Sequence, residues 1–284
     1  MGACEQLELE ICSHRGLLSG NIQPRLLTLQ RLETLVVQER IRCADLDLSE
    51  LNSTTRVGHP ADLADLDASQ AVTFPELLKV LQDYPPRFFA LELKKEPMDR
   101  EQLVSLLERL RAGGLPWQSI GVWYLPQDLP LFEQLHRDQH PETLGIMAVF
   151  DRPWRGAPAG STMSLEMAER SGIPVLGMSI HVSSELLTEA QRRGLAVAAF
   201  GVNSEEDLLK AAAGGVRWVL SDEPLRMRQA VMQLRSNLGC DQQWNIWILI
   251  LIALAATACV LRPPWRLSAL VVLPILLGCR LREH

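Results

Sequence analysis

The sequence predicts an α/β protein: a (β/α)8 TIM barrel followed by a C-terminal membrane-associated helical segment. Three observations lead to this prediction. Short β-rich runs alternate with helical patterns between residues 7 and 235, which is the order expected of parallel strands joined by helices. The connections are short, and no low-complexity linker divides this part into two soluble domains. A long uncharged, apolar stretch begins only after the alternation has ended, at Trp244.

Eight β-rich runs are the predicted strands, and turn or polar residues bound them. Helical patterns lie between the strands; over residues 25–40, for example, leucine and valine side chains recur on one face of a helix. An open, doubly wound sheet is the alternative, because periodicity alone does not show whether a sheet closes. The predicted strands cover residues 7–13, 42–48, 88–94, 119–124, 144–150, 174–180, 195–202 and 216–221.

The C-terminal segment has the composition of a membrane element. Residues 244–261 carry no charged side chain, and a helix of about 18 residues is roughly 27 Å long, close to the thickness of the hydrocarbon core. Trp244 and Trp247 suit the membrane interface, and a shorter apolar run follows at 267–279. We therefore expect a barrel over 1–235, a linker over 236–243 and a membrane segment over 244–284. A helical hairpin buried in the globule is the alternative.

Composition narrows the classes of partner and compartment. The 284 residues carry a formal net charge of −6 without a basic stripe, which argues against nucleic-acid binding. The six cysteines are scattered and form no C-x-x-C pair, so reduced thiols are expected rather than a zinc site or a disulfide framework. The N-terminus lacks the pattern of a secretory signal. We therefore expect the barrel on the cytoplasmic side of the membrane.

Polar side chains cluster where the first three predicted strands end, which is where barrels of this class carry their active sites. His14 follows the first strand. Asp45 and Asp47 lie near the end of the second strand and, being two residues apart, point to the same side. Glu92 and Lys94 do so on the third. Burying several carboxylates is costly unless a cation neutralises them, and Mg²⁺ or Ca²⁺ prefers such oxygen ligands.

These motifs resemble those of the glycerophosphodiester phosphodiesterase (GDPD) superfamily, a group of phospholipase C-like phosphodiesterase TIM barrels related to the sphingomyelinase D toxins. The stretch "SHRG" is similar to the opening His-Arg-Gly of that superfamily, and "ADLDL" to its acidic-x-Asp strand. "VGHP" stands where a second histidine is expected, and "LELK" matches a Glu-x-Lys motif. The segment 194–224, ending in "SDEP", resembles the closing strand–helix–strand. The resemblance covers most of the part before the apolar tail.

The resemblance implies a metal-dependent phosphodiesterase that acts on glycerophosphodiesters or lysophospholipids by phosphoryl transfer, with Mg²⁺ or Ca²⁺ as its cofactor, and the apolar tail predicts that it is membrane-anchored. A substrate hydroxyl attacks the phosphorus in such enzymes. The implied general acid and base are His14 and His59. The residues implied to face the phosphate are Arg15 and Lys94, and the implied metal ligands are Asp45, Asp47 and Glu92.

The chain also departs from the superfamily pattern. No Glu-Asn-Thr follows the His-Arg-Gly, and Asp45 stands where a glutamate is usual. Pro60 follows His59 in place of an aspartate, and Phe200 replaces a tryptophan, although Asn203 is retained. A catalytically inactive barrel that serves as a membrane-tethered binding or scaffold protein is therefore the alternative. The short stretch between the second histidine and "LELK" predicts little more than a loop and one helix, and so an open mouth that favours a lipid-derived substrate.

Overall fold

The computed structural model describes residues 9–20, 26–51, 54–64, 67–94, 99–115, 119–137, 144–237 and 240. The chain divides into two compact units, Met1–Leu234 and Arg235–His284, and the first contains the strands. The predicted linker over 236–243 lies mostly, and the predicted membrane segment over 244–284 entirely, outside the described residues. Among the helices that the structure describes, none combines the length and the apolar character needed to cross a membrane.

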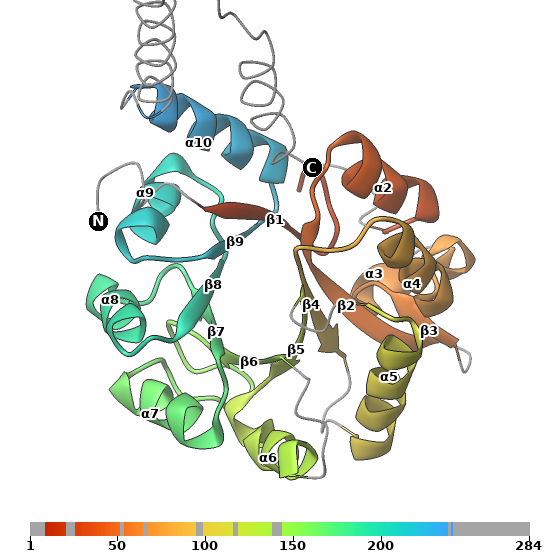
Figure 1. The fold of residues 1–284 in the computed structure, drawn as a ribbon, viewed down its shortest axis with the longest axis horizontal. Coiled ribbons are helices and arrows are strands. Elements are labelled where there is room, and N and C mark those ends of the chain that lie inside the picture. The colour runs from red at the N-terminus through yellow and green to blue at the C-terminus, as the bar shows by residue number, and fades with distance from the viewer. Residues whose placement is uncertain are drawn as a thin grey trace, which may run out of the picture. The chain divides into compact units, whose positions relative to one another are not determined.

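The parallel strands close into a barrel, as the sequence predicts, so the alternative of an open sheet is wrong. The sheet runs in the order β1-β9-β8-β7-β6-β5-β4-β2-β3, and a further pairing of β1 with β2 closes it. Figure 1 shows the strands as a ring with the helices outside it. The strands are β1 (Glu10–His14), β2 (Cys43–Leu51), β3 (Thr54–Val57), β4 (Phe88–Leu93), β5 (Ile120–Tyr124), β6 (Leu144–Val149), β7 (Val175–Ser179), β8 (Ala196–Phe200) and β9 (Trp218–Ser221).

Strand β3 is absent from the sequence-based prediction. It pairs antiparallel with the end of β2, with Leu48 opposite Val57, because β2 continues beyond the barrel and the chain turns back along it. The backbone N–H of Gly58, just after β3, donates to the carbonyl of Asp47 at 2.8 Å. This hairpin therefore brings the next residue, His59, beside the end of β2.

The helices begin where side chains cap them. In α4, Thr73 and Glu76 form a capping box, and Asp99 caps α5 through the backbone N–H of Glu101. The stretch between the second histidine and β4 holds more helix than predicted: α3, a short 3-10 turn and α4. The helices are α2 (Leu29–Glu33, continued by a π turn, Thr34–Gln38), α3 (Pro60–Ala64), α4 (Phe74–Asp83), α5 (Arg100–Ala112), α6 (Leu129–Arg137), α7 (Thr162–Ser171), α8 (Ser184–Arg192), α9 (Glu205–Ala213) and α10 (Pro224–Asn237), with 3-10 turns at Ala68–Gln70 and Pro126–Asp128.

The barrel interior is a packed core rather than a channel. Phe88 and Trp218 stack inside it with ring centroids 4.2 Å apart. The indole of Trp123 approaches Gly177 so closely that a β-carbon there would lie 1.9 Å from the ring, so this position requires glycine. A larger, leucine-rich cluster fills the space between strands and helices. Because side chains fill the ring, a ligand reaches it only from one end.

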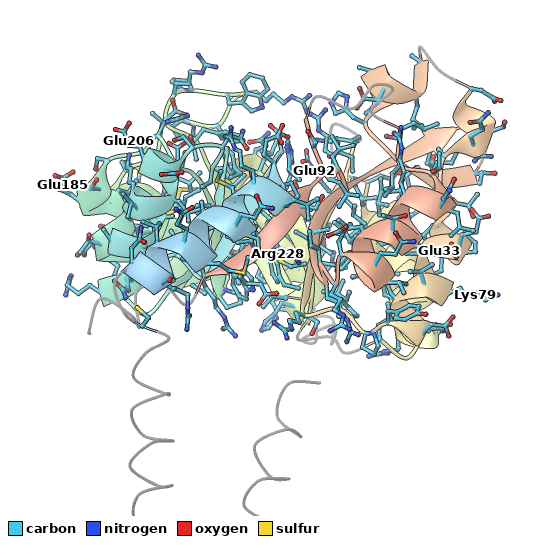
Figure 2. All side chains as sticks on the ribbon, turned by 90° about the horizontal axis from the view of Figure 1, so that it is seen from above. Glu33, Lys79, Glu92, Glu185, Glu206 and Arg228 are labelled. Atoms are coloured by element: carbon cyan, nitrogen blue, oxygen red, sulfur yellow. A yellow bond between two sulfur atoms is a disulfide. The ribbon has the colours of Figure 1, made fainter. Side chains whose placement is uncertain are left out.

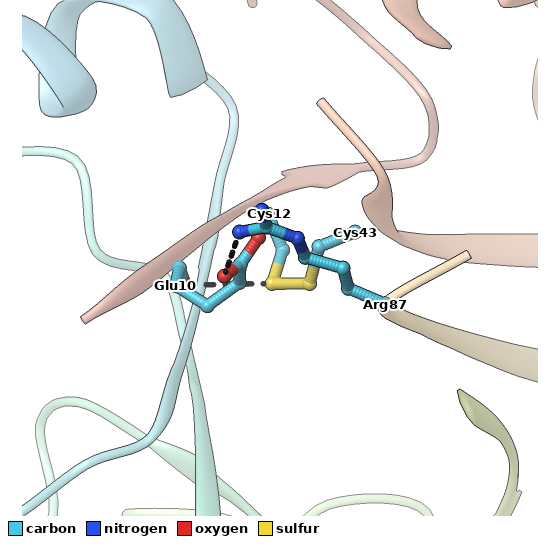
Figure 3. The surroundings of a disulfide bond; sticks show 4 residues. All are labelled: Glu10, Cys12, Cys43 and Arg87. Carbon is cyan, nitrogen blue, oxygen red and sulfur yellow. Dashed lines mark hydrogen bonds and ion pairs between the residues drawn. A yellow bond between two sulfur atoms is a disulfide. The ribbon is translucent and has the colours of Figure 1, made fainter. Parts of the chain in front are cut away.

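Cys12 and Cys43 form a disulfide inside the barrel, so the expectation of reduced thiols is wrong for this pair. Figure 3 shows the bond, which joins neighbouring strands β1 and β2. Their Cα atoms are 4.5 Å apart, within the range that a disulfide spans. The two cysteines are 31 residues apart in sequence, and only the closure of the barrel makes them neighbours. Their spacing therefore carried no signal.

Candidate active site

A tight turn at the end of β1 presents the first histidine and arginine. Arg15 and Gly16 both adopt left-handed backbone conformations, with φ of 56° and 69°, and the N–H of Leu17 donates to the carbonyl of His14 at 3.2 Å. A β-carbon on Gly16 would lie 2.8 Å from the side chain of Leu27. Gly16 is thus needed for the turn itself, and the strained backbone of Arg15 is typical of functional sites.

His14 is held by a network from the closing strands. Its Nδ1 lies 2.8 Å from Oδ1 of Asp222, and the Asn203 amide donates to the other carboxylate oxygen at 3.1 Å. The backbone N–H of Asp222 donates in turn to Oδ1 of Asn203 at 2.9 Å. Burial alone lowers the pKa of His14, but the hydrogen bond to Asp222 and the charges of Asp222 and Asp45 outweigh it and raise the pKa. The ring is therefore fixed and favours the protonated form.

Three carboxylates lie at the same end of the barrel. Asp47 and Glu92 are cross-strand partners on β2 and β4, while Asp45 and Asp47 are only 5% and 3% exposed. The indole Nε1 of Trp123 donates to Oδ1 of Asp45 at 2.7 Å. Burial raises the pKa of Asp45 to about 7, and the charges of Asp47 and Glu92 act in the same direction. The cluster therefore holds an unusually large number of carboxylates for a buried location.

Two cationic side chains face the acids. Lys94 Nζ lies 3.0 Å from Asp47 Oδ1 and 2.5 Å from Glu92 Oε1, and Arg15 Nε lies 3.4 Å from Asp47 Oδ2. The Arg15 Nε and the Asp47 Oδ2 are both buried, and apart from this ion pair with each other neither atom makes a hydrogen bond within the described residues. Burying a donor and an acceptor that form no hydrogen bond costs free energy of folding. The site therefore has capacity for both an anionic and a cationic ligand.

His59 approaches the same acids from the hairpin of β2 and β3. The N–H of Ala61 donates to its Nδ1 at 3.2 Å, which leaves Nε2 as the proton-bearing nitrogen of a neutral ring. Partial burial lowers the pKa of His59, as do the charges of Arg15 and Lys94, although Asp47 opposes this. The two histidines thus differ: the environment favours the charged form of His14 and the neutral form of His59.

These groups line one pocket of about 280 Å³ at the carboxyl ends of the strands. In Figure 2, Glu185 and Glu206, in the first turns of α8 and α9, lie toward the same end of the barrel as Glu92, whereas Lys79, late in α4, lies toward the other end. Of the seven site residues predicted from the sequence, six line the pocket and Asp47 lies beneath them against Lys94. The polar part of the lining includes His14, Arg15, Asp45, His59, Glu92, Lys94 and Asp222, and the apolar part includes Trp123, Leu125, Phe150, Trp154 and Phe200.

The donor set suits a hard divalent cation in charge and chemistry, but the described side chains are not gathered around a vacant centre. No three His, Cys, Asp or Glu side chains within the described ranges are grouped as metal ligands. Lys94 bridges two of the predicted ligands instead. Two features nevertheless fit a bound cation: Oδ2 of Asp47 accepts no hydrogen bond within the described residues, and the carboxylates outnumber the cationic side chains.

Asp222 and Trp123 belong to the site but were not among the predicted residues. A signal existed for Asp222, since it lies in the "SDEP" turn that carried the resemblance, although no role was assigned to it. Trp123 gave no signal, because a tryptophan inside a strand is usually a core residue. Its hydrogen bond to Asp45 is visible only once β5 and β2 share the barrel interior.

Comparison with solved structures shows the same fold in several phosphodiesterases. One is a Silicibacter pomeroyi protein assigned as a glycerophosphoryl diester phosphodiesterase, with a TM-score of 0.63 and 18% identity over 82% of this chain and 97% of the other. An Oleispira antarctica phosphodiesterase bound to the product sn-glycerol-3-phosphate gives a TM-score of 0.60 and 19% identity, covering 80% and 98%. A Thermotoga maritima glycerophosphodiester phosphodiesterase gives 0.57 and 16%, covering 78% and 97%.

No protein-family model matches the chain, and no curated protein matches it by sequence. The chain therefore has the fold of the glycerophosphodiester phosphodiesterase barrels, and at these levels of identity the likeness concerns the fold. The relation to sphingomyelinase D stays a prediction. Any activity must be argued from the site.

Proposed function

We propose that this protein is a phosphodiesterase that hydrolyses glycerophosphodiesters or lysophospholipids by phosphoryl transfer. One observation carries the proposal: a buried arginine Nε without a hydrogen-bond partner lies in the same pocket as two histidines whose pKa values are shifted in opposite directions. An anion that also needs one proton donor and one proton acceptor fits this combination. A phosphodiester undergoing cleavage is such an anion.

Arg15 and Lys94 bind the phosphate of the substrate. The Arg15 Nε gains a partner when a phosphate oxygen accepts from it, and the guanidinium suits oxyanions because several N–H groups lie in one plane. Lys94 keeps its charge in the pocket: burial lowers its pKa, but Asp47 and Glu92 outweigh burial and raise it. Both cations therefore offset the charge that develops on the phosphoryl oxygens.

Proton transfer falls to the two histidines. His59, neutral near pH 7, accepts the proton of the attacking hydroxyl at Nδ1, its unprotonated nitrogen, which then no longer accepts from the N–H of Ala61. Protonated His14 gives a proton to the leaving oxygen. Asp222 binds Nδ1 of His14, so the other ring nitrogen, Nε2, points away from Asp222 and is the one that gives the proton. No serine, threonine or cysteine is among the described residues that line the pocket. Tyr124 also lines the pocket, but burial raises the pKa of its hydroxyl and so disfavours it as a nucleophile. We therefore propose that the attacking oxygen is that of water or of a substrate hydroxyl.

We also propose dependence on a divalent cation, Mg²⁺ or Ca²⁺. The residues that would hold it are Asp45, Asp47 and Glu92. The strongest indication of a cation is that the buried Oδ2 of Asp47 accepts no hydrogen bond within the described residues. When bound, such an ion would polarise the phosphoryl group and add to the positive charge supplied by the two side chains. Lys94 contacts two of these acids, Asp47 and Glu92, so an ion held by them would add to the charge that the lysine already supplies there.

A panel of phosphodiesters, assayed with and without a chelator, tests the activity and the metal together. We expect release of the headgroup alcohol, together with glycerol phosphate from a glycerophosphodiester or lysophosphatidate from a lysophospholipid, or the cyclic form of either. Chelator should remove most of this activity, and Mg²⁺ or Ca²⁺ should restore it. Full activity in excess chelator would show that the proposed metal dependence is wrong, whereas the proposed phosphodiesterase activity would stand.

The alternative is a catalytically inactive barrel that binds a ligand at the membrane. The bridging of Asp47 and Glu92 by Lys94 favours it, because the lysine already neutralises these carboxylates. Titration calorimetry with Mg²⁺ and Ca²⁺ discriminates between the two readings. A folded protein that binds neither ion and cleaves no member of the panel would support the inactive barrel.

The apolar side of the pocket favours a lysophospholipid among the candidate substrates. Trp154 is 46% exposed, and Phe150 lies between it and Phe200, with ring centroids 6.1 Å and 5.6 Å away. A glycerophosphodiester with a small headgroup has no apolar part to cover these rings, whereas the acyl chain of a lysophospholipid has one. Transfer of such a chain from water onto the rings is favourable.

Replacing Trp154 by alanine should therefore raise the KM for a lysophospholipid by about tenfold, the equivalent of losing part of one large apolar contact. The KM for glycerophosphocholine should stay within about twofold, because that substrate lacks the acyl chain. Met163, also exposed but on α7 and outside the pocket lining, is the matched control when changed to alanine. Equal effects of Trp154→Ala on both substrates would contradict the acyl-chain assignment.

We further propose that the apolar segment from Trp244 onward attaches the protein to a membrane, and that the barrel does not need this segment to fold. The strands and the pocket residues all precede residue 235. A chain truncated before Trp244 is expected to be soluble, to keep the circular dichroism spectrum of the barrel and to lose membrane association on flotation. Aggregation of the truncated chain would show that the tail belongs to the core.

A further inference from the structure

The disulfide lies directly below two side chains of the proposed active site, His14 and Asp45. Cys12 precedes His14 by two residues on β1, and Cys43 precedes Asp45 by two residues on β2. Side chains two residues apart on a strand point to the same side, and His14 and Asp45 are themselves cross-strand partners. The bond therefore forms the layer beneath the His14–Asp45 pair, inside the barrel.

The same bond crosses the seam at which the barrel closes. The β1–β2 ladder consists of the pairs Ser13–Ala44 and His14–Asp45, whereas β2 and β4 are paired over six positions. The disulfide occupies the next position below this short ladder. Beneath it, an ion pair joins Glu10 to Arg87 at 3.2 Å (Figure 3). A covalent link thus reinforces the least extensive strand pairing next to the site.

Both sulfurs are out of reach of solvent. Cys12 and Cys43 have 0% exposed surface and belong to the cluster that fills the barrel interior. Thiol–disulfide exchange requires a thiolate to attack a sulfur atom directly. The folded barrel therefore protects the bond, which distinguishes it from a reversible switch on the surface.

We propose that the Cys12–Cys43 disulfide is a positioning element for His14 and Asp45, made once during oxidative folding of the barrel. The proposal rests on the proposed function in taking these two side chains as part of the reaction. Two thiols lose two electrons and two protons as the S–S bond forms. A disulfide oxidant of the glutathione disulfide class accepts them and leaves as two thiols.

This chemistry bears on the side of the membrane that the barrel faces. Disulfides persist in oxidising compartments and are rare in the reducing cytosol. The expectation of a cytoplasmic barrel came from the lack of a secretory pattern alone. The disulfide favours a lumenal or extracellular face for a chain that is attached to a membrane.

The test is to refold the full chain from a reduced, denatured state with and without glutathione disulfide. Without the oxidant, kcat should be about tenfold lower and KM within about twofold, because displacement of a reacting group by a fraction of an ångström costs rate more than binding. Dithiothreitol added to the native protein should leave kcat unchanged. Alkylation in denaturant without reductant, followed by peptide mass analysis, should leave Cys12 and Cys43 unlabelled.

The double variant Cys12→Ala/Cys43→Ala is the matched comparison, since it retains every other cysteine. Its kcat should be low and independent of the oxidant. Val175→Ala, which removes a buried side chain from the same interior cluster on β7, should lower the melting temperature while keeping kcat. That control separates positioning from a general loss of packing.

Two outcomes overturn the proposal, and they differ from failure of the proposed function. Labelling of Cys12 and Cys43 in the oxidised protein would show that the bond is not formed. A double variant with the kcat of the wild type would show that the bond only stabilises the fold. An oxidised wild type that cleaves no phosphodiester overturns the proposed function, and the positioning role with it, whatever the peptide analysis gives.

Discussion

Replacing His14 by alanine is expected to lower kcat by about 10²–10⁴, the range that a lost general acid or base typically costs. The variant leaves the leaving oxygen without its proton donor, because the structure places no second histidine on β1 or beside Asp222 among the described residues. KM should change less, since Arg15 and Lys94 still bind the phosphate. Steady-state kinetics on the best substrate of the panel measure both parameters.

The control for this experiment is His136→Ala, which removes an imidazole that stacks on Phe132 in α6, with ring centroids 5.8 Å apart, outside the pocket. Asp222→Asn probes the support of His14 without removing it. We expect a smaller loss than for His14→Ala, because the amide keeps the shape but no longer stabilises the charged ring. Wild-type kcat in His14→Ala would remove this residue from the reaction.

The fold was predictable because the barrel strands are short apolar runs that alternate with helices along the described residues. Strands such as Phe88–Leu93 and Val175–Ser179 start and end within one or two residues of their predicted limits. The hairpin strand Thr54–Val57 was missed for a physical reason: it lies outside the ring and pairs with the overhanging end of β2. Barrel periodicity therefore gives no indication of it.

Closure of the barrel was not predictable from periodicity, although it decides the site. An open sheet and a barrel have the same alternation of strands and helices, and they differ only in whether β1 pairs with β2. That pairing puts His14 opposite Asp45 and Cys12 next to Cys43. The resemblance of short motifs to a known superfamily supplied the information that the pattern lacked.

Partners of the site residues were the least predictable feature. Alternation along β2 placed Asp45 and Asp47 on one side, and the structure has both buried at the end of the barrel. Nothing in the sequence indicated that Trp123 would donate to Asp45 or that Lys94 would bridge two acids. Such contacts depend on which strands are neighbours and on rotamers, and both follow from tertiary packing.

The pH dependence of the reaction should reveal the second histidine. His59 must be neutral to accept a proton, and its pKa is lowered, so it stays neutral down to a pH below the ordinary value of 6.5. His14 must be protonated to donate, and its pKa is raised, so it stays charged above 6.5. In saturating Mg²⁺ or Ca²⁺, which would keep Asp45 ionised although burial raises its pKa to about 7, the kcat/KM profile should therefore be bell-shaped and cover neutral pH. Its acid limb is then due to His59 and its alkaline limb to His14.

Replacing His59 by alanine should lower kcat by about 10²–10⁴ and abolish the acid limb, while the alkaline limb remains. The limb changes because the remaining activity no longer needs a neutral imidazole on the hairpin, whereas protonated His14 is still required. Asp222→Asn should leave the acid limb in place and move the alkaline limb to lower pH, because the carboxylate that raises the pKa of His14 is gone. An acid limb that persists unchanged in His59→Ala would assign it to another group and leave His59 without the role of base.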